Sequence, residues 1–134
     1  MAGAARIGIT GLGTMGAALA LNMAARDVRV AVHNRSPART EALMARAGDP
    51  ARNLVATRDL DAFVEALARP RAILIMVAAG DAVRQTIEAL VPRLENGDTL
   101  IDAGNADFND TVATSARLAE QGVHFLGIGV SGGE

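Results

Sequence analysis

Six consecutive residues near the start of the chain, Gly11-Leu12-Gly13-Thr14-Met15-Gly16, fit the pattern G-x-G-x-x-G. They follow an apolar run (residues 5–10) and precede a helix-like run (residues 17–25). Between a strand and a helix, the first glycine permits a tight turn, the second lets backbone approach a pyrophosphate, and the third lets the helix pack closely. The helix N-terminus then offers N–H groups to an anion. We predict a dinucleotide-binding turn, and the alternative is a plain turn whose glycines serve packing only.

The rest of the chain alternates between strand-like and helix-like segments. Its strand candidates are mostly continuous apolar runs, which is typical of parallel strands covered on both faces. This alternation predicts one dinucleotide-binding domain over residues 1–134 with a Rossmann-type α/β fold. The expected sheet is doubly wound and parallel, in strand order 3-2-1-4-5-6, with helices on both faces. We expect strands at residues 6–10, 28–33, 54–56, 72–77, 99–102 and 123–128, and helices at residues 14–25, 37–47, 60–68, 82–90 and 110–121.

Composition argues against several other classes of protein. A net charge of −2 gives no broad field for nucleic acid or membranes, and three Phe with no Tyr or Trp offer few surfaces for base stacking. The longest apolar run, residues 72–79, is too short to span a bilayer. The chain has no Cys, and its only imidazoles, His33 and His124, are far apart, so we expect no metal site. We therefore expect a soluble cytoplasmic protein without nucleic-acid or membrane partners.

The end of the second expected strand predicts which dinucleotide is bound. NAD-specific sites carry an Asp or Glu there for the ribose 2′-hydroxyl, whereas this chain has Asn34-Arg35-Ser36. A guanidinium can fork onto a 2′-phosphate, and the Asn and Ser side chains can add hydrogen bonds. We predict NADP as the cofactor. The alternative is a solvated Arg35 and a Ser36 that only caps the next helix.

Three further loops follow expected strands and should lie near the cofactor. Val77, Ala78 and Ala79 follow the fourth strand, where small residues allow close backbone approach, although the spacing fits a simple strand-to-helix loop equally well. Asn105 follows the fifth, and its amide suits a carboxamide and a substrate hydroxyl together, although it could equally cap a helix. After the sixth strand, Ser131, Gly132 and Gly133 form either an anion-binding nest or a flexible terminus.

Taken together, these stretches resemble the N-terminal coenzyme domain of the 6-phosphogluconate dehydrogenase family, the decarboxylating enzymes of the pentose phosphate pathway. The resemblance covers nearly the whole chain but only about the first third of a typical member. The matching pieces are Gly11-Leu12, Met15-Gly16, residues 19–24, Asn34-Arg35-Ser36, Arg69-Pro70-Arg71, Val77, Ala79-Gly80, Gly97-Asp98, Ile101-Asp102, Gly104-Asn105, Asp110-Thr111 and residues 129–134.

The resemblance implies NADP contacts at residues 11–16, 34–36 and 77–79, and Asn105 beside both cofactor and substrate. It implies that Ser131, Gly132 and Gly133 hold the sugar-acid phosphate. In the family, hydride leaves C3 of 6-phosphogluconate and CO2 is then lost to give ribulose 5-phosphate. A lysine base and a glutamate acid, both beyond this sequence, move the protons. We therefore expect this chain, which lacks the helical catalytic domain, to bind cofactor without turnover, and the full-length form to be a homodimer.

The chain also departs from the family pattern. Gly13 stands where the family usually has Ala, Ala78 where it often has Lys, Ala103 for a Gly, and Ala106 for a Ser or similar residue. The sister 3-hydroxyisobutyrate-type dehydrogenases share the glycine turn and the Ser-Gly-Gly loop, and they remain an alternative, as does a non-catalytic NADP-binding module. Without a helical domain, apolar residues near the last strand, Phe125 and Ile128, should be exposed and could mediate dimerisation.

Overall fold

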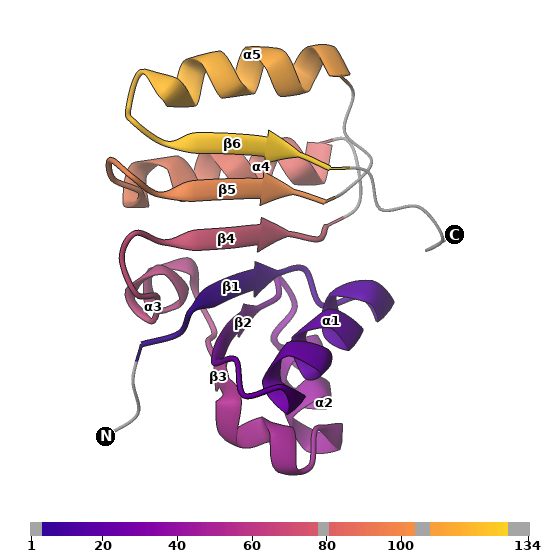
Figure 1. Cartoon of the computed structure of the whole chain (residues 1–134). Coiled ribbons are helices and arrows are strands. Elements are labelled where there is room, and N and C mark those ends of the chain that lie inside the picture. Colours follow the sequence, from indigo (N-terminus) through magenta and orange to yellow (C-terminus); the bar gives the residue numbers. More distant parts are fainter. Residues whose placement is uncertain (1–3, 78–80, 104–107, 129–134) are drawn as a thin grey trace.

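The chain forms a single six-stranded parallel sheet in the order β3-β2-β1-β4-β5-β6, as predicted (Figure 1). The computed structural model describes residues 4–77, 81–103 and 108–128. Neighbouring strands pair in parallel throughout, and the order reverses direction between β1 and β4. The strands are β1 (Ile7–Thr10), β2 (Val30–His33), β3 (Leu54–Ala56), β4 (Ala72–Ile75), β5 (Thr99–Asp102) and β6 (His124–Gly127).

Helices cover both faces of this sheet (Figure 1). One face carries α1 (Thr14–Ala25) and α2 (Pro37–Arg46), and the other carries α3 (Leu60–Glu65), α4 (Asp81–Leu90) and α5 (Phe108–Ala119). Two short 3-10 segments, η1 (Asp49–Asn53) and η2 (Val91–Arg93), were not anticipated from the sequence. Within the described ranges, no helix has the length and apolar character needed to cross a membrane.

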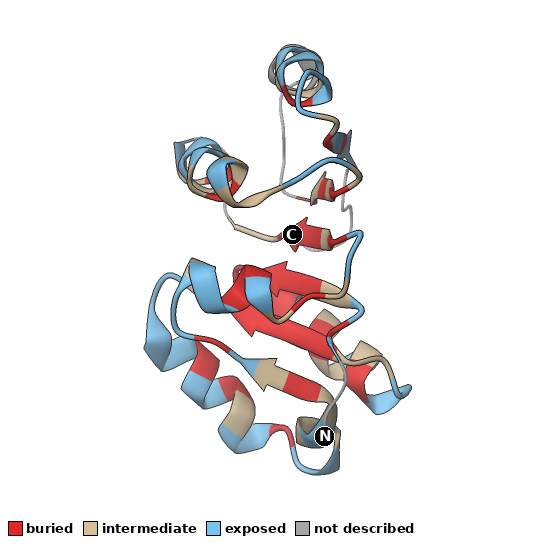
Figure 2. Cartoon of the chain, turned by 90° about the vertical axis from the view of Figure 1, so that its left-hand side faces the viewer, coloured by how far each residue is buried: buried red, intermediate tan, exposed pale blue. Residues whose placement is uncertain are grey.

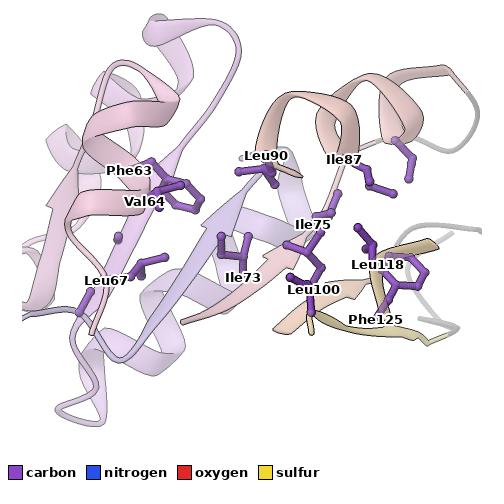
Figure 3. Close-up of a cluster of buried hydrophobic side chains, with 14 residues drawn as sticks. Phe63, Val64, Leu67, Ile73, Ile75, Ile87, Leu90, Leu100, Leu118 and Phe125 are labelled. Atoms are coloured by element: carbon purple, nitrogen blue, oxygen red, sulfur yellow. The ribbon is translucent and has the colours of Figure 1, made fainter. Parts of the chain in front are cut away.

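The hydrophobic core is divided into two clusters because successive strand residues point to opposite faces. Ile73 and Ile75 of β4 are fully buried beneath α3 and α4, where Phe63 and Leu90 pack against the sheet (Figure 3). Leu74, between them, joins the second cluster under α1 and α2. The burial pattern places the red, buried residues on the strands and on the inward sides of the helices (Figure 2). This double burial accounts for the continuous apolar runs in the sequence.

Several element boundaries differ from the prediction by one to three residues, and α3 shows why. The expected helix ran to residue 68, but α3 ends at Glu65. Leu67 instead forms a parallel bridge with Ala5, and the Ala68 N–H donates to the Ala5 carbonyl at 2.9 Å. The chain leaves the helix early because a distant segment takes up its backbone hydrogen bonds, an effect that local periodicity does not encode.

A buried ion pair closes the amino end of the sheet, opposite the glycine-rich turn. Arg71 precedes β4 and Asp98 precedes β5, with their side chains 5% and 1% exposed. The Arg71 guanidinium lies 3.1 Å from the Asp98 carboxylate. The same carboxylate accepts the Arg71 N–H at 2.8 Å and the Glu95 N–H at 2.9 Å. The carboxylate therefore organises the entry into both strands.

The expectation of an exposed apolar surface near the last strand is half right. Phe125 is only 7% exposed, because it pairs in register with Leu100 on the face covered by α4 and α5. Leu126 and Ile128 alternate to the opposite face and are 53% and 47% exposed. The prediction for Phe125 was wrong because period-2 alternation turns it into the core, whereas Ile128 is exposed as expected.

Candidate dinucleotide-binding site

The glycine-rich turn lies at the carboxyl end of β1, beside the point where the strand order reverses (Figure 1). Gly11 has a φ of +101°, and a Cβ there would stand 2.7 Å from the backbone carbon of Met76. Any side chain at Gly16 would overlap the Gly11 carbonyl oxygen. A Cβ at Gly13, by contrast, would meet only the Arg39 guanidinium, at 3.8 Å. The first and third glycines are therefore needed by the fold, whereas the second leaves open space over the turn.

The start of α1 offers N–H groups to an anion. Gly13 is the N-cap residue, so no side chain caps the helix, and its first turn contains no acidic residue. Thr14 and Met15 are exposed in this first turn. Unsatisfied N–H groups and the helix dipole together favour a bound phosphate at such a position. This local geometry agrees with the predicted role of the motif.

The turn between β2 and α2 lies next to the glycine-rich turn and carries Asn34, Arg35 and Ser36. Arg35 and Ser36 are exposed, and Arg35 makes no ion pair with any described residue. Ser36 occupies the N-cap position of α2 with Pro37 next, as predicted, but its hydroxyl makes no capping hydrogen bond. The Asn34 amide is held by backbone groups on both sides. The two exposed side chains are thus the ones available to a ligand.

Arg39 is a further basic residue at this site that the sequence prediction did not include. It lies in the first turn of α2, and its guanidinium approaches the glycine-rich turn at Gly13. It lines a hollow of about 270 Å³ between α1 and α2, together with Leu12, Gly13, Thr14, Ala17, Ala42, Leu43 and Arg46. Its place in the first turn of the helix expected from residue 37, directly after the turn that carries Arg35, was the available sequence signal.

The loop after β4 reaches the same place through Val77. The Val77 nitrogen would lie 2.8 Å from a Cβ on Gly11, so the two backbones are in close contact. Ala78 and Ala79 fall outside the described residues, as do Asn105, Ser131, Gly132 and Gly133. Asp102 and Ala103, which lead toward Asn105 at the carboxyl end of β5, are 1% and 6% exposed.

His33 lies beneath the site and serves the fold. Its Nδ1 is 2.8 Å from the Thr10 hydroxyl oxygen, and its ring centroid is 5.6 Å from that of Phe63. Burial lowers the pKa of His33 below its ordinary value of 6.5, although the charge of Asp59 opposes the shift. The imidazole is 9% exposed, so it supports the two strands from the side of α3.

Comparisons with known proteins agree with this geometry. The family model described as the NAD-binding domain of 6-phosphogluconate dehydrogenase matches residues 6–134. The NADP+-dependent, decarboxylating 6-phosphogluconate dehydrogenase of Bacillus subtilis is 47% identical over 129 residues, which are 96% of this chain and 27% of that protein. The chain thus spans about a quarter of the length of this curated relative.

Two solved structures share this fold. The 6-phosphogluconate dehydrogenase of Plasmodium falciparum, studied with its cofactor NADP+ and with its substrate 6-phosphogluconate, superposes with a TM-score of 0.88 at 32% identity. The match covers 96% of this chain and 27% of that one. A Mycobacterium tuberculosis 3-hydroxyisobutyrate dehydrogenase superposes with a TM-score of 0.78 at 23% identity, over 97% of this chain and 42% of that one. The second likeness shows a shared fold only.

Proposed function

The chain belongs to the 6-phosphogluconate dehydrogenase family as a homologue of its NAD-binding domain, and we propose that it binds NADP at the carboxyl ends of β1, β2 and β4. The observation that carries this proposal is the exposed turn with Arg35 and Ser36, which contains no acidic residue and lies beside the glycine-rich turn. An acid at this position would favour NAD, whereas a free guanidinium favours a 2′-phosphate.

In the proposed complex, Gly13 and the first turn of α1 would hold the pyrophosphate. The 2′-phosphate is bound by the Arg35 guanidinium and the Ser36 hydroxyl, and Arg39 adds a second positive charge between the two phosphate groups. Val77 lines the cofactor from β4. The same proposal assigns Ala78 and Ala79 to the cofactor and Asn105 to both cofactor and substrate. Bound NADP supplies the hydride acceptor.

The activity of the complete protein is proposed from the named relatives. We propose that it oxidises 6-phosphogluconate and releases CO2, with Ser131, Gly132 and Gly133 holding the sugar-acid phosphate. Residues 1–134 are the dinucleotide-binding domain in this proposal, and the catalytic acid and base come from a helical domain. A cytoplasmic homodimer completes the proposal for the full-length form. Sedimentation analysis of that form tests the dimer, and a monomer over the whole concentration range would refute it.

Calorimetric titration with NADPH and NADH tests the cofactor assignment. We expect this chain to bind NADPH at least about tenfold more tightly than NADH, because a charge-assisted hydrogen bond contributes roughly 1.5–3 kcal/mol. Arg35→Ala should remove this preference and leave NADH binding unchanged. Arg58→Ala is the matched control, since Arg58 is also exposed but is paired with Glu41 at 3.0 Å. Equal binding of the two cofactors by the wild-type chain would refute the 2′-phosphate assignment.

Turnover tests the proposed reaction. The full-length protein should form NADPH and CO2 in equal amounts from NADP+ and 6-phosphogluconate, whereas the chain of 134 residues should bind cofactor without turnover. Oxidation of 3-hydroxyisobutyrate in place of 6-phosphogluconate would assign the protein to the sister enzymes. NADPH binding without any hydroxy-acid oxidation would indicate a non-catalytic module.

A further inference from the structure

Asn34 connects the two turns of the proposed cofactor site through both ends of its side-chain amide. Its Oδ1 accepts the backbone N–H of Leu12 at 2.7 Å, and its Nδ2 donates to the carbonyl of Ser36 at 3.1 Å. These two partners allow only one orientation of the amide, because the Leu12 N–H needs an acceptor oxygen and the Ser36 carbonyl needs a donor. Leu12 belongs to the glycine-rich turn and Ser36 to the 2′-phosphate turn.

We infer that Asn34 is a positioning residue that fixes the glycine-rich turn relative to the 2′-phosphate turn. This inference rests on the proposed NADP site. The carbonyl oxygen of the Asn34 amide and one of its two N–H groups are used in these hydrogen bonds, so backbone groups of both turns hold the side chain. Arg35 and Ser36, whose side chains are exposed, bind the 2′-phosphate in the proposed site.

The hydrogen bond between Leu12 and Asn34 also limits which N–H groups are available to the pyrophosphate. The Gly11 N–H donates to the His33 carbonyl at 3.0 Å, and the Leu12 N–H is taken by Asn34. The first two amides of the motif are thus used to shape the turn, and the anion has to bind the N–H groups that follow. Because the Asn34 side chain joins both turns, its loss should weaken the binding of any dinucleotide, with or without a 2′-phosphate.

Affinities for the two cofactors separate a positioning residue from a ligand. Asn34→Ala removes both hydrogen bonds and should weaken the binding of NADPH and NADH by the same factor, at least about fivefold for bonds of ordinary strength. Arg35→Ala should weaken NADPH alone. If Asn34→Ala weakens NADPH and leaves NADH unchanged, Asn34 is a phosphate ligand and the inference is wrong. A wild-type chain that binds neither cofactor would refute the proposed function, and the measurement below would still test the link.

Amide hydrogen exchange of the ligand-free chain tests the link itself. Asn34→Asp keeps the acceptor oxygen for Leu12 but loses the donor to Ser36, whereas Asn34→Ala loses both. The Leu12 N–H should exchange faster in Asn34→Ala and stay protected in Asn34→Asp. The core amide of Leu74 on β4 reports whether each variant is folded. Unchanged protection of Leu12 in a folded Asn34→Ala chain would overturn the inference.

Discussion

The Nδ1 atom of His33 lies 2.8 Å from the hydroxyl oxygen of Thr10, and this buried hydrogen bond joins β2 to β1 directly beneath the glycine-rich turn. The two residues are also register partners in the sheet. The Gly11 N–H then donates to the His33 carbonyl, so side chain and backbone together fix the start of the turn. A titratable group therefore supports the geometry on which phosphate binding depends.

Stability should fall as the pH is lowered below about 6.5, because burial lowers the pKa of His33 in the folded chain. The unfolded chain then binds the proton more tightly. The stabilisation is complete above the unfolded pKa and is lost as the pH falls toward the lower folded pKa. Denaturant midpoints measured over about one pH unit on either side of 6.5 test this prediction. The comparison is His33→Gln, whose side chain does not titrate. An equally steep loss in His33→Gln would assign the dependence to other groups.

The glycines of the motif should respond differently to a methyl group. Gly16→Ala places a Cβ against the Gly11 carbonyl, which is rigid backbone, and should cost about 2–3 kcal/mol of unfolding free energy. Gly13→Ala meets only a flexible guanidinium at 3.8 Å, so its effect should stay within about 0.5 kcal/mol. Urea denaturation of both variants decides the matter. Equal destabilisation of the two variants would contradict this prediction, because the space around Gly13 and Gly16 would then not determine the cost.

Asp98 should be among the most sensitive polar positions in the chain. Asp98→Ala removes the buried carboxylate from the Arg71 guanidinium, which is 5% exposed and keeps only the half-exposed Glu95 carboxylate, 3.5 Å away. This change should cost about 3–5 kcal/mol. The control is Glu41→Gln, which breaks the exposed ion pair with Arg58 and should cost at most about 1 kcal/mol. Thermal and urea unfolding would measure both. A loss below about 1 kcal/mol for Asp98→Ala would show that Glu95 or water replaces the carboxylate at the amino end of the sheet.

Adjacent residues of β6 should differ in their contribution to stability. Phe125 is 7% exposed and packs under α4 and α5, so Phe125→Ala should cost about 3 kcal/mol. Leu126→Gln changes a side chain that is 53% exposed on the opposite face and should stay within about 0.5 kcal/mol. Unfolding midpoints test the pair. A large loss for Leu126→Gln would reveal that this face is covered in solution, for example by a second copy of the chain.

The sequence by itself determined the strand order, the two-sided burial and the location of the glycine-rich turn. Those features follow from local signals: apolar runs long enough for buried strands, helical segments between them, and the handedness of parallel crossovers. The turn that carries Arg35 and contains no Asp or Glu could be identified in the same way, because it directly follows the second strand in the sequence.

Only the tertiary structure decided which side chains at that turn are free. Asn34 and Leu12 are 22 residues apart, and the hydrogen bond between them forms only when β1 and β2 lie side by side. The approach of Arg39 to Gly13 and the burial of Phe125 have the same origin. Each depends on the packing of distant segments, so local patterning could indicate a cofactor turn but could not assign the role of each residue within it.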